Sequence, residues 1–388
     1  MTATAPIVWI AGTSWDGVAG TDKCLVSEIA RSRPVLWVDP PASLSLASAR
    51  DSILSSFSRR DKARERALSQ VTKNLWHLKV PPMRGAARPV LRRVKATLLN
   101  RATSAALTEL NWAPAAVVVA HAFTPFPLGL GGRRVFFVTD DWLEGSALMG
   151  VSAPELRRVL QLNLAHADAV VAVSDPLLVR LGKLRPDPPN SSSEGPVFEV
   201  LPNGCPQIAP APTYMNRDPT ACLVGQLNER LDIRVLEALQ AAGVELVIIG
   251  PRTDRDPVFG RRLNSVLAAE NVHWLGRLET DQVRQRLRLA GVGITPYADT
   301  PFNRASFPLK TLEYLSAGLA VVSTETPSAR WLKTDLISLS ATPEDFVSSV
   351  FTALASRDNK DMEMLRRHFA SHHSWAARAT QFQQLVTG

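Results

Sequence analysis

Residues 299–325 read DTPFNRASFPLKTLEYLSAGLAVVSTE, and this stretch decides the fold. A polar loop leads into a segment over 308–316 whose composition predicts a helix. Gly318 follows, and glycine is the residue most often found just after the end of a helix. The run Leu319–Ser323 then predicts a buried strand. Loop, helix, glycine and buried strand in this order are typical of one unit of an α/β protein.

The N-terminus of this helix is the first candidate site. We expect Ser306 or Phe307 as the cap and Pro308 at the first helical position, where its missing N–H costs nothing. Free N–H groups and the helix dipole attract anions at such a position. Lys310 opposes the dipole unless a phosphate lies at the helix end, and Glu313, one turn further on, is placed to accept hydrogen bonds from ribose hydroxyls. The alternative is an ordinary exposed Lys and Glu.

Short β-branched runs alternate with helical patterns through the whole chain, which predicts parallel sheets covered by helices. Predicted strands of the first half are Ile7–Ala11, Val35–Val38, Leu75–Lys79, Val117–Ala120, Val135–Val138, Ala169–Val173 and Val197–Leu201. Those of the second half are Ala221–Val224, Glu245–Ile249, Val272–Leu275, Val292–Thr295, Leu319–Ser323 and Leu336–Leu339. Predicted helices of the first half cover 21–31, 89–110, 154–166 and a segment from Pro176. The fold class is α/β, with two Rossmann-like halves that bind ligands at the carboxyl ends of their strands.

A proline-rich linker separates the two halves. Four prolines lie between 206 and 219, directly after Asn203-Gly204. We therefore expect one domain over 1–203 and a second over 204–373.

Several pieces of the second half together resemble a known family. The wording Pro308-Leu309-Lys310, Glu313-Tyr314, Ala317-Gly318 and Val321-Val322-Ser323 resembles the donor-binding motif of GT-B glycosyltransferases, especially the family-four-like bacterial nucleotide-sugar enzymes, or glycosyl transferases group 1. Other pieces follow in family order: Leu201-Pro202-Asn203-Gly204, the run from Val224-Gly225 to Asp232, Ile249-Gly250-Pro251 and His273-Trp274-Leu275-Gly276. The resemblance is strong over about 200–330 and weaker in the first half. Ser374-Trp375 and the helix that follows, over 374–388, resemble the terminal helix of this family, which crosses back onto the first domain.

The resemblance implies a GT-B fold and a role for each matching residue. Lys310 would bind the donor diphosphate, Glu313 the ribose, and the Gly225 loop the phosphates or the sugar. The full implied donor set is Gly225, Asn228, Arg230, Gly250, Pro308, Leu309, Lys310 and Glu313. Ala305 departs from the family, whose common E-x7-E pair would require Glu at that position. The sugar contact of that Glu therefore has no counterpart in the motif.

Polar residues at strand ends of the first half are the catalytic candidates. His121 follows the strand Val117–Ala120, at the place where the family has a histidine that contacts the donor sugar. Asp140 and Asp141 follow Val135–Val138, so one of them could face inward as a general base. A structural histidine and a helix cap or solvated carboxylate pair are the alternatives.

A glycine loop follows the first strand. Gly12, Thr13, Asp16 and Gly17 belong to it, and it resembles the loop that GT-B enzymes direct at the donor or acceptor. The loop is not G-x-G-x-x-G, so it does not predict a dinucleotide site.

Composition limits the class of protein. The chain has 388 residues, 45% of them apolar, and 44 Lys and Arg against 36 Asp and Glu, which gives a net charge of +8. No apolar run reaches the roughly 18 residues needed to span a bilayer, and we expect no signal peptide. Three cysteines exclude a disulfide scaffold and favour a cytoplasmic location.

No metal site is expected. Asp254-Arg255-Asp256 precedes Pro257 and is interpreted as a helix cap rather than a metal-binding D-x-D motif. His368, His372 and His373 have no nearby Cys or carboxylate ligand, which favours a surface cluster.

The positive charge is concentrated in one tract. Residues 50–101 hold 14 Lys and Arg against three acids, a net charge of +11, so the rest of the chain is slightly acidic. Because Phe57 and Trp76 are its only aromatics, the tract does not resemble a single-stranded nucleic-acid site, and we expect no nucleic-acid partner. An anionic membrane surface and a solvated face remain the two interpretations.

The resemblance implies a glycosyltransferase that moves a sugar from a UDP- or GDP-sugar to a hydroxyl of a glycan, a glycolipid or a small molecule. A membrane-associated lipid or a cell-envelope glycan is the acceptor we expect. The nucleotide sugar is a co-substrate, and no other cofactor is expected. If the enzyme retains configuration, as the resemblance implies, His121 orients the sugar and no base is needed; if it inverts, Asp140 or Asp141 is the base. A GT-B-shaped sugar-nucleotide epimerase and a non-catalytic nucleotide-sugar-binding protein are the alternatives.

Overall fold

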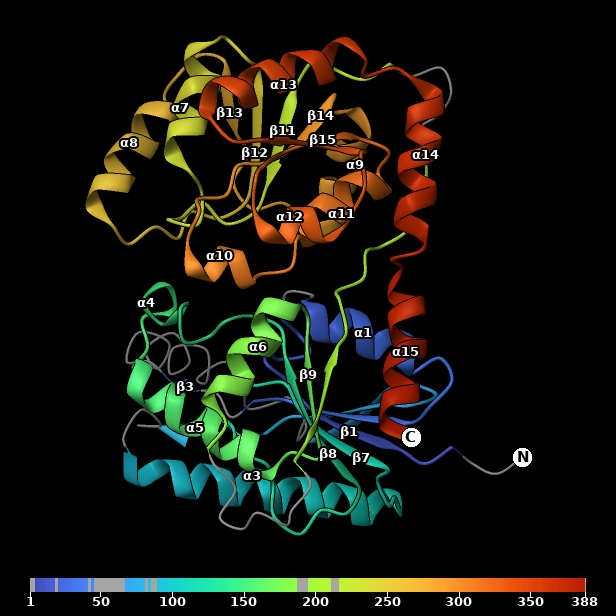
Figure 1. The fold of residues 1–388 in the computed structure, drawn as a ribbon. Coiled ribbons are helices and arrows are strands. Elements are labelled where there is room, and N and C mark those ends of the chain that lie inside the picture. Colours follow the sequence, from blue (N-terminus) through green and yellow to red (C-terminus); the bar gives the residue numbers. More distant parts are fainter. Residues whose placement is uncertain are drawn as a thin grey trace, which may run out of the picture.

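The chain forms two α/β halves, one above the other in Figure 1. The computed structural model describes residues 4–17, 20–40, 43–44, 67–80, 83–84, 89–186, 195–210 and 216–387. Each half is a mainly parallel sheet flanked by helices, as the alternating pattern predicts.

The first sheet has the strand order β10-β9-β8-β7-β1-β2-β5-β4. Its strands are β1 (Ile7–Ile10), β2 (Val35–Val38), β4 (Leu68–Thr72), β5 (Leu75–Leu78), β7 (Ala116–Val119), β8 (Arg133–Val138), β9 (Ala169–Ala172) and β10 (Val197–Val200). The central strands are buried along their whole length, which explains their continuous apolar runs. The edge strand β4 runs antiparallel to β5 and exposes all its residues except Leu68, so it carries no apolar run to predict it.

Helices cover the first sheet on both faces (Figure 1). They are α1 (Thr21–Ile29), α3 (Pro89–Leu110), α4 (Ser146–Met149), α5 (Ala153–His166) and α6 (Asp175–Leu184), and a separate strand pair joins β3 (Ser43–Leu44) to β6 (Met83–Arg84). The helix over 89–110 is confirmed. Its buried side includes Leu99 and Leu107, whereas Val94 and Leu98 are each 44% exposed.

The second sheet has the strand order β13-β12-β11-β14-β15-β16 and is parallel throughout its described strands. Its strands are β11 (Ala221–Val224), β12 (Leu246–Ile249), β13 (Val272–Trp274), β14 (Val292–Thr295), β15 (Ala320–Thr324) and β16 (Ile337–Ser340). Its helices are α7 (Ile233–Ala241), α8 (Pro257–Leu267), α9 (Thr280–Leu289), α10 (Pro301–Ala305), α11 (Leu309–Ser316), α12 (Pro327–Trp331), α13 (Pro343–Ala355) and α14 (Lys360–Ser371). Asp256 caps α8 by accepting the N–H of Val258 at 2.7 Å, which confirms the helix-cap interpretation of the Asp254–Asp256 segment.

The start of the decisive helix differs from the expectation. Helix α11 begins at Leu309 with Pro308 as its N-cap, so the predictions of Ser306 or Phe307 as the cap and of Pro308 inside the helix are wrong. Ser306 instead ends the short helix α10, which lies in the stretch that we interpret from the sequence as a polar loop. Thr300 starts α10 by accepting the N–H of Asn303 at 3.2 Å, so the loop has its own cap and its own helix.

The chain crosses between the halves twice, side by side. Cys205 forms a bridge with Ser374, so the segment that leaves β10 lies against the segment that joins α14 to α15 (Trp375–Thr387). Helix α15 lies on the first half beside α1 (Figure 1), with Phe382 packed on Trp9 at a ring separation of 5.3 Å. The predicted boundary at 203/204 falls in the first of these crossings.

No helix within the described ranges combines the length and the hydropathy that a bilayer span requires.

Candidate active site

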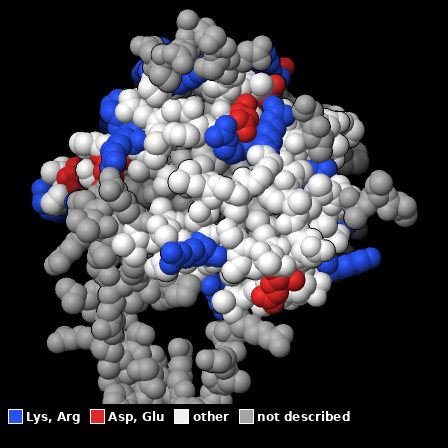
Figure 2. Space-filling view, turned by 90° about the horizontal axis from the view of Figure 1, so that it is seen from below, with Lys and Arg blue, Asp and Glu red and all other residues white. Residues whose placement is uncertain are grey.

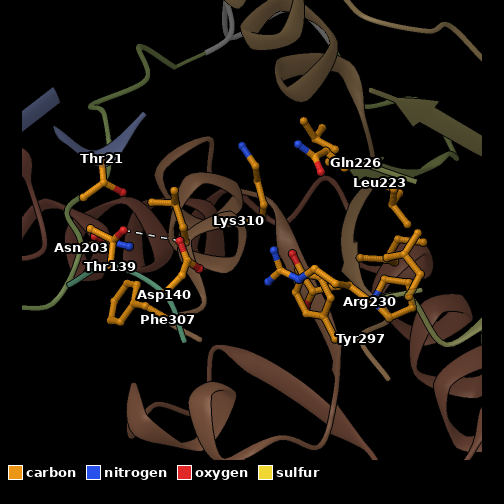
Figure 3. A pocket seen from close by; sticks show the side chains of 17 residues that line it. Thr21, Thr139, Asp140, Asn203, Leu223, Gln226, Arg230, Tyr297, Phe307 and Lys310 are labelled. Atoms are coloured by element: carbon orange, nitrogen blue, oxygen red, sulfur yellow. Dashed lines mark hydrogen bonds between the residues drawn. The ribbon is translucent and has the colours of Figure 1, made fainter. Parts of the chain in front are cut away.

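A cavity of about 330 Å³ lies where the carboxyl ends of the two sheets face each other. Figure 3 shows side chains from both halves around it. The first half contributes Thr21, Thr139, Asp140 and Asn203; the second contributes Leu223, Val224, Gly225, Gln226, Arg230, Leu231, Ile294, Thr295, Pro296, Tyr297, Phe307, Leu309 and Lys310. This is the position at which parallel α/β sheets bind ligands.

Two helix N-termini contribute to the wall of the cavity. Thr21 is the first residue of α1, and Leu309 and Lys310 are the first two residues of α11. The first turn of a helix leaves N–H groups without intrahelical partners and carries partial positive charge. The cavity therefore suits an anionic ligand.

Lys310 and Glu313 lie together on α11. The Lys310 ammonium donates a hydrogen bond to Glu313 Oε2 at 2.6 Å, and the two side chains are 28% and 19% exposed. Burial lowers the pKa of Lys310, but the Glu313 carboxylate outweighs burial and the net pKa is raised, so Lys310 is a cation at neutral pH. Lys310 lines the cavity, whereas Glu313 does not belong to the lining.

Arg230 is the second cation of the cavity. It follows β11 on the Gly225 loop, and its guanidinium lies over the rings of Tyr297 and Phe302, 5.4 and 4.7 Å from their centroids. Figure 3 shows its side chain extending into the cavity toward Lys310 and Asp140. Stacking on aromatic rings fixes the plane of an arginine.

Other residues of the implied donor set have structural roles next to the cavity. Gly250 has a φ of +145°, and a Cβ there would lie 1.7 Å from the Gly225 carbonyl oxygen, so only glycine lets these two strand ends meet. Asn228 is buried and accepts the N–H of Arg230 at 3.1 Å. Pro308 caps α11. The cavity lining contains half of the implied donor set, namely Gly225, Arg230, Leu309 and Lys310. It does not contain the other half, Asn228, Gly250, Pro308 and Glu313.

The structure separates the two adjacent carboxylates at the end of β8. Asp141 is buried in an ion pair with Arg180 and accepts the N–H of Glu144 at 3.1 Å. Asp140 lines the cavity opposite Arg230. Burial raises the pKa of Asp140, and the charge of Arg230 lowers it in part. Asp140 is thus the one of the pair that faces the cavity.

His121 lies at the end of β7, outside the cavity lining. Its Nδ1 is 2.6 Å from Thr124 Oγ1, and its ring packs edge-on against Phe123. Burial lowers the pKa of His121 to about 4, with Lys95 adding to the effect. The imidazole is neutral at neutral pH, which suits a hydrogen-bonding role better than a proton-donating one.

The glycine loop also lies outside the cavity lining. Gly12 donates its N–H to Asp22 at 2.9 Å, Gly17 closes a turn with Ser14, and Asp16 pairs with Lys79 at 3.1 Å. Thr13 is exposed.

The carboxylate of Asp39, just after β2, forms hydrogen bonds with residues in the middle of the glycine loop. It accepts hydrogen bonds from Ser14 Oγ at 2.8 Å and from the N–H of Trp15 at 2.9 Å. On its other side the Nε1–H of Trp37 donates to it at 3.0 Å.

Ala305 has a role in the contact between the halves. It is fully buried, and its carbonyl oxygen accepts a hydrogen bond from Ser174 Oγ of the first half at 2.6 Å. Close by, Trp331 donates its Nε1–H to Asp175 at 3.0 Å. The position that the motif would give to a sugar-binding Glu is therefore occupied by packing against the other half.

Several cavity residues escaped the sequence reasoning. Thr139 directly follows β8, and Pro296 and Tyr297 directly follow β14, so their place after predicted strands was an available signal. Gln226 lies within the run from Val224 to Asp232 that resembles the family, but no role is implied for it by the resemblance. Within the described ranges, no group of three or more His, Cys, Asp or Glu side chains is arranged to hold a metal ion.

The second half of the chain is similar in sequence to a known family. Residues 218–356 match the family model described as Glycosyl transferases group 1. A 157-residue segment is 29% identical to a protein of Bacillus subtilis (strain 168) named "Putative teichuronic acid biosynthesis glycosyltransferase TuaH". This match spans 39% of each protein.

Solved structures match nearly the whole chain at low identity. Sucrose-phosphate synthase from Thermosynechococcus elongatus superimposes with a TM-score of 0.70 at 13% identity, covering 98% of both chains. WaaG, a glycosyltransferase involved in lipopolysaccharide biosynthesis, gives 0.63 at 15% identity, covering 98% of this chain and 100% of its own. Anabaena Alr3699/HepE in complex with UDP and glucose gives 0.62 at 12% identity, covering 99% of both chains. The chain therefore has the GT-B fold, and its second half carries the sequence signature of glycosyl transferases group 1.

Proposed function

We propose that this protein transfers a sugar from a nucleoside-diphosphate sugar to an acceptor hydroxyl. The observation that carries the proposal is the cavity between the halves, where Lys310, Arg230 and the N-terminus of α11 gather positive charge opposite Asp140. The family match over the second half and the UDP complex of the structural neighbour HepE support a nucleotide donor.

The leaving diphosphate is where most charge develops during transfer. Hydrogen-bond donors fixed in advance around developing charge are commonly the largest contribution to catalysis. In this proposal the two cations and the first turn of α11 bind the diphosphate, and Glu313 exchanges its bond with Lys310 for the ribose hydroxyls. Enclosure between two halves would also exclude water and suppress hydrolysis of the donor.

The geometry assigns different roles under the two stereochemical outcomes. With retention, which the family resemblance favours, no protein base is required and the neutral His121 would orient the sugar. With inversion, Asp140 would be the base, because Asp141 is engaged by Arg180. We propose retention without a metal ion.

We further propose that the acceptor is anionic or is held at an anionic membrane on the cytoplasmic side. The basic tract over 50–101 supports this, although much of it lies outside the described residues. Figure 2 shows the face on which α3 lies, where separate Lys and Arg side chains surround a broad uncharged area. Exposed apolar side chains belong to this half, including Leu98 on α3, and Leu128 is 78% exposed at the edge of a groove of about 660 Å³ beside that helix. A relative named for teichuronic acid biosynthesis supports a cell-envelope product.

The test is incubation of the full chain with radiolabelled UDP- and GDP-sugars and a membrane extract. Label on lipid, glycan or water supports the transferase. A new donor epimer would identify an epimerase, and binding without turnover would identify a non-catalytic protein; either result overturns the proposal.

The variant Lys310→Ala tests the diphosphate assignment. We expect kcat/KM to fall about 100-fold, as when one donor to developing charge is removed. The matched control is Lys360→Ala, which removes the lysine of another i,i+3 Lys–Glu pair, at the start of α14. Unchanged turnover in Lys310→Ala, or an equal loss in both variants, would show that Lys310 does not bind the diphosphate.

A further inference from the structure

Arg230 is held in the cavity without an ion-pair partner among the described residues, and Asp140 on the opposite wall is the carboxyl whose pKa its charge lowers. The Nε–H of Arg230 donates to Asn303 Oδ1 at 3.1 Å, and no described Asp or Glu pairs with it. Its two terminal nitrogens donate to no described residue. The guanidinium therefore keeps its charge and its outer hydrogen-bonding edge.

Asn303 is itself fixed at every polar atom of its side chain. It is 2% exposed, and its Nδ2 donates to the carbonyl oxygens of Arg230 at 2.9 Å and Ala298 at 2.8 Å. Its backbone N–H is bound by the Thr300 cap at 3.2 Å. One amide thus fixes both the backbone and the side chain of Arg230.

The neutrality of Asn303 is the important property. Nearby arginines of this half are neutralised by acids: Arg304 by Asp299 and Arg252 by Asp254. A charged acceptor at position 303 would bind Arg230 more tightly but would cancel its charge. An amide orients the guanidinium and leaves the charge for a ligand.

We propose that Asn303 is the positioning residue for Arg230, which it directs, still charged, at the diphosphate of the donor. This inference rests on the proposed function, since it takes the cavity to be the nucleotide site. It also explains how the site orients a cation without any contribution from position 305, where Ala305 is buried against the other half.

The test is calorimetric binding of UDP and GDP to the full chain, using whichever binds the wild type more tightly. Asn303→Asp should weaken binding at least tenfold and reduce its dependence on salt, because the new carboxylate neutralises Arg230. Asn303→Ala should weaken binding only about threefold and keep the wild-type salt dependence, because the charge remains but is less well oriented.

A double-mutant cycle separates positioning from a general structural effect. In an Arg230→Met background, Asn303→Asp should change the affinity less than about twofold, because the residue through which it acts is gone. Asn163→Asp is the matched control: Asn163 is fully buried on α5 and also bridges two backbone groups, those of Thr124 and Phe126, but it contacts no cavity cation. Its nucleotide affinity should equal that of the wild type.

Each outcome decides one of the two proposals. If neither UDP nor GDP binds the wild type, the proposed function fails and this inference with it. If the wild type binds but Asn303→Asp has the same effect with and without Arg230, Asn303 is only structural and this inference alone fails. If Asn303→Asp does not fold by circular dichroism, Asn303→Ala and its cycle with Arg230→Met decide by the same criterion.

Discussion

At the scale of single residues, hydrogen bonds decide how two buried carboxylates of the first half, Asp22 and Asp39, respond to burial. Asp22, in the first turn of α1, is 8% exposed, and burial raises its pKa to about 6, although the N–H of Gly12 opposes the shift. For Asp39 burial also acts to raise the pKa, but the hydrogen bonds from His77, the N–H of Trp15 and Ser14 Oγ outweigh burial and the net pKa is lowered. The difference lies in the number of donors that the fold supplies to each group.

The raised pKa of Asp22 predicts a specific dependence of stability on pH. Between pH 3.8 and about 6 the folded chain binds more protons than the unfolded chain, so the free energy of unfolding contributed by Asp22 falls as the pH rises through this window. Asp22→Asn should remove this loss and stabilise the protein at pH 7 by up to about 3 kcal/mol. Urea unfolding of both proteins at pH 4 and pH 7 measures the effect.

Asp39→Asn is the matched comparison, because its folded pKa is lowered. The stability that Asp39 contributes is present above its unfolded pKa and is lost as the pH falls, so Asp39→Asn should destabilise at pH 7. If Asp22→Asn destabilises at pH 7 as Asp39→Asn does, the account of Asp22 is wrong.

At the scale of elements, the ends of β11 and β12 depend on one glycine. Gly250 donates its N–H to the Gly276 carbonyl at 2.7 Å while its own Cα lies against Gly225. The Gly225 loop can lie at the cavity only if these two strand ends stay in contact. The motif wording therefore includes Gly250 for a steric reason rather than for ligand contact.

Gly250→Ala should be strongly destabilising. The added Cβ would overlap the Gly225 carbonyl, so the loop has to move, at a cost of roughly 3 kcal/mol or more in the free energy of unfolding. Gly243→Ala is the control, since Gly243 also has a positive φ but open space around it, and it should cost only about 1 kcal/mol. Equal losses in urea unfolding would show that backbone strain, and not the contact with Gly225, sets the requirement.

At the scale of the whole molecule, charge is divided between the two halves. The tract over 50–101 carries a net charge of +11, while the chain as a whole carries +8. Because this tract belongs to the half opposite the Lys310 motif, its charge would bear on the acceptor rather than on the nucleotide in the proposed transferase. The net charge of the chain alone does not make that distinction.

Vesicle binding tests the membrane proposal. The full chain should sediment with vesicles containing anionic phosphatidylglycerol at least tenfold more strongly than with phosphatidylcholine alone, and salt should weaken the binding, since each surface cation contributes about 1 kcal/mol. Leu128→Glu should reduce the binding severalfold, because it puts a like charge and a polar group at an exposed apolar site. Leu365→Glu, at an exposed leucine of α14 in the other half, is the control.

Equal binding to neutral and anionic vesicles would contradict the membrane proposal. The transferase proposal does not depend on that result, because the cavity between the halves shares no lining residue with the groove beside α3.

Much of the fold was predictable from sequence because it rests on local patterns. Strands such as Val35–Val38 and Val292–Thr295 have their predicted bounds, since a strand buried on both faces is a continuous apolar run. The exceptions are local conflicts. Helix α10 has only five residues, too few to show a helical periodicity, and β4 is stabilised by pairing with β5 rather than by burial.

The sequence by itself determined the α/β order of elements, the two halves, the place of Lys310 in the first turn of a helix and that of Arg230 after a strand. Periodicity, helix starts and strand ends are properties of neighbouring residues. Only the tertiary structure decided that Asp140 and not Asp141 faces the cavity, that Ala305 is buried against Ser174, and that Asn303 orients Arg230. These facts depend on hydrogen bonds between residues up to 131 positions apart, and no local pattern encodes such a pairing.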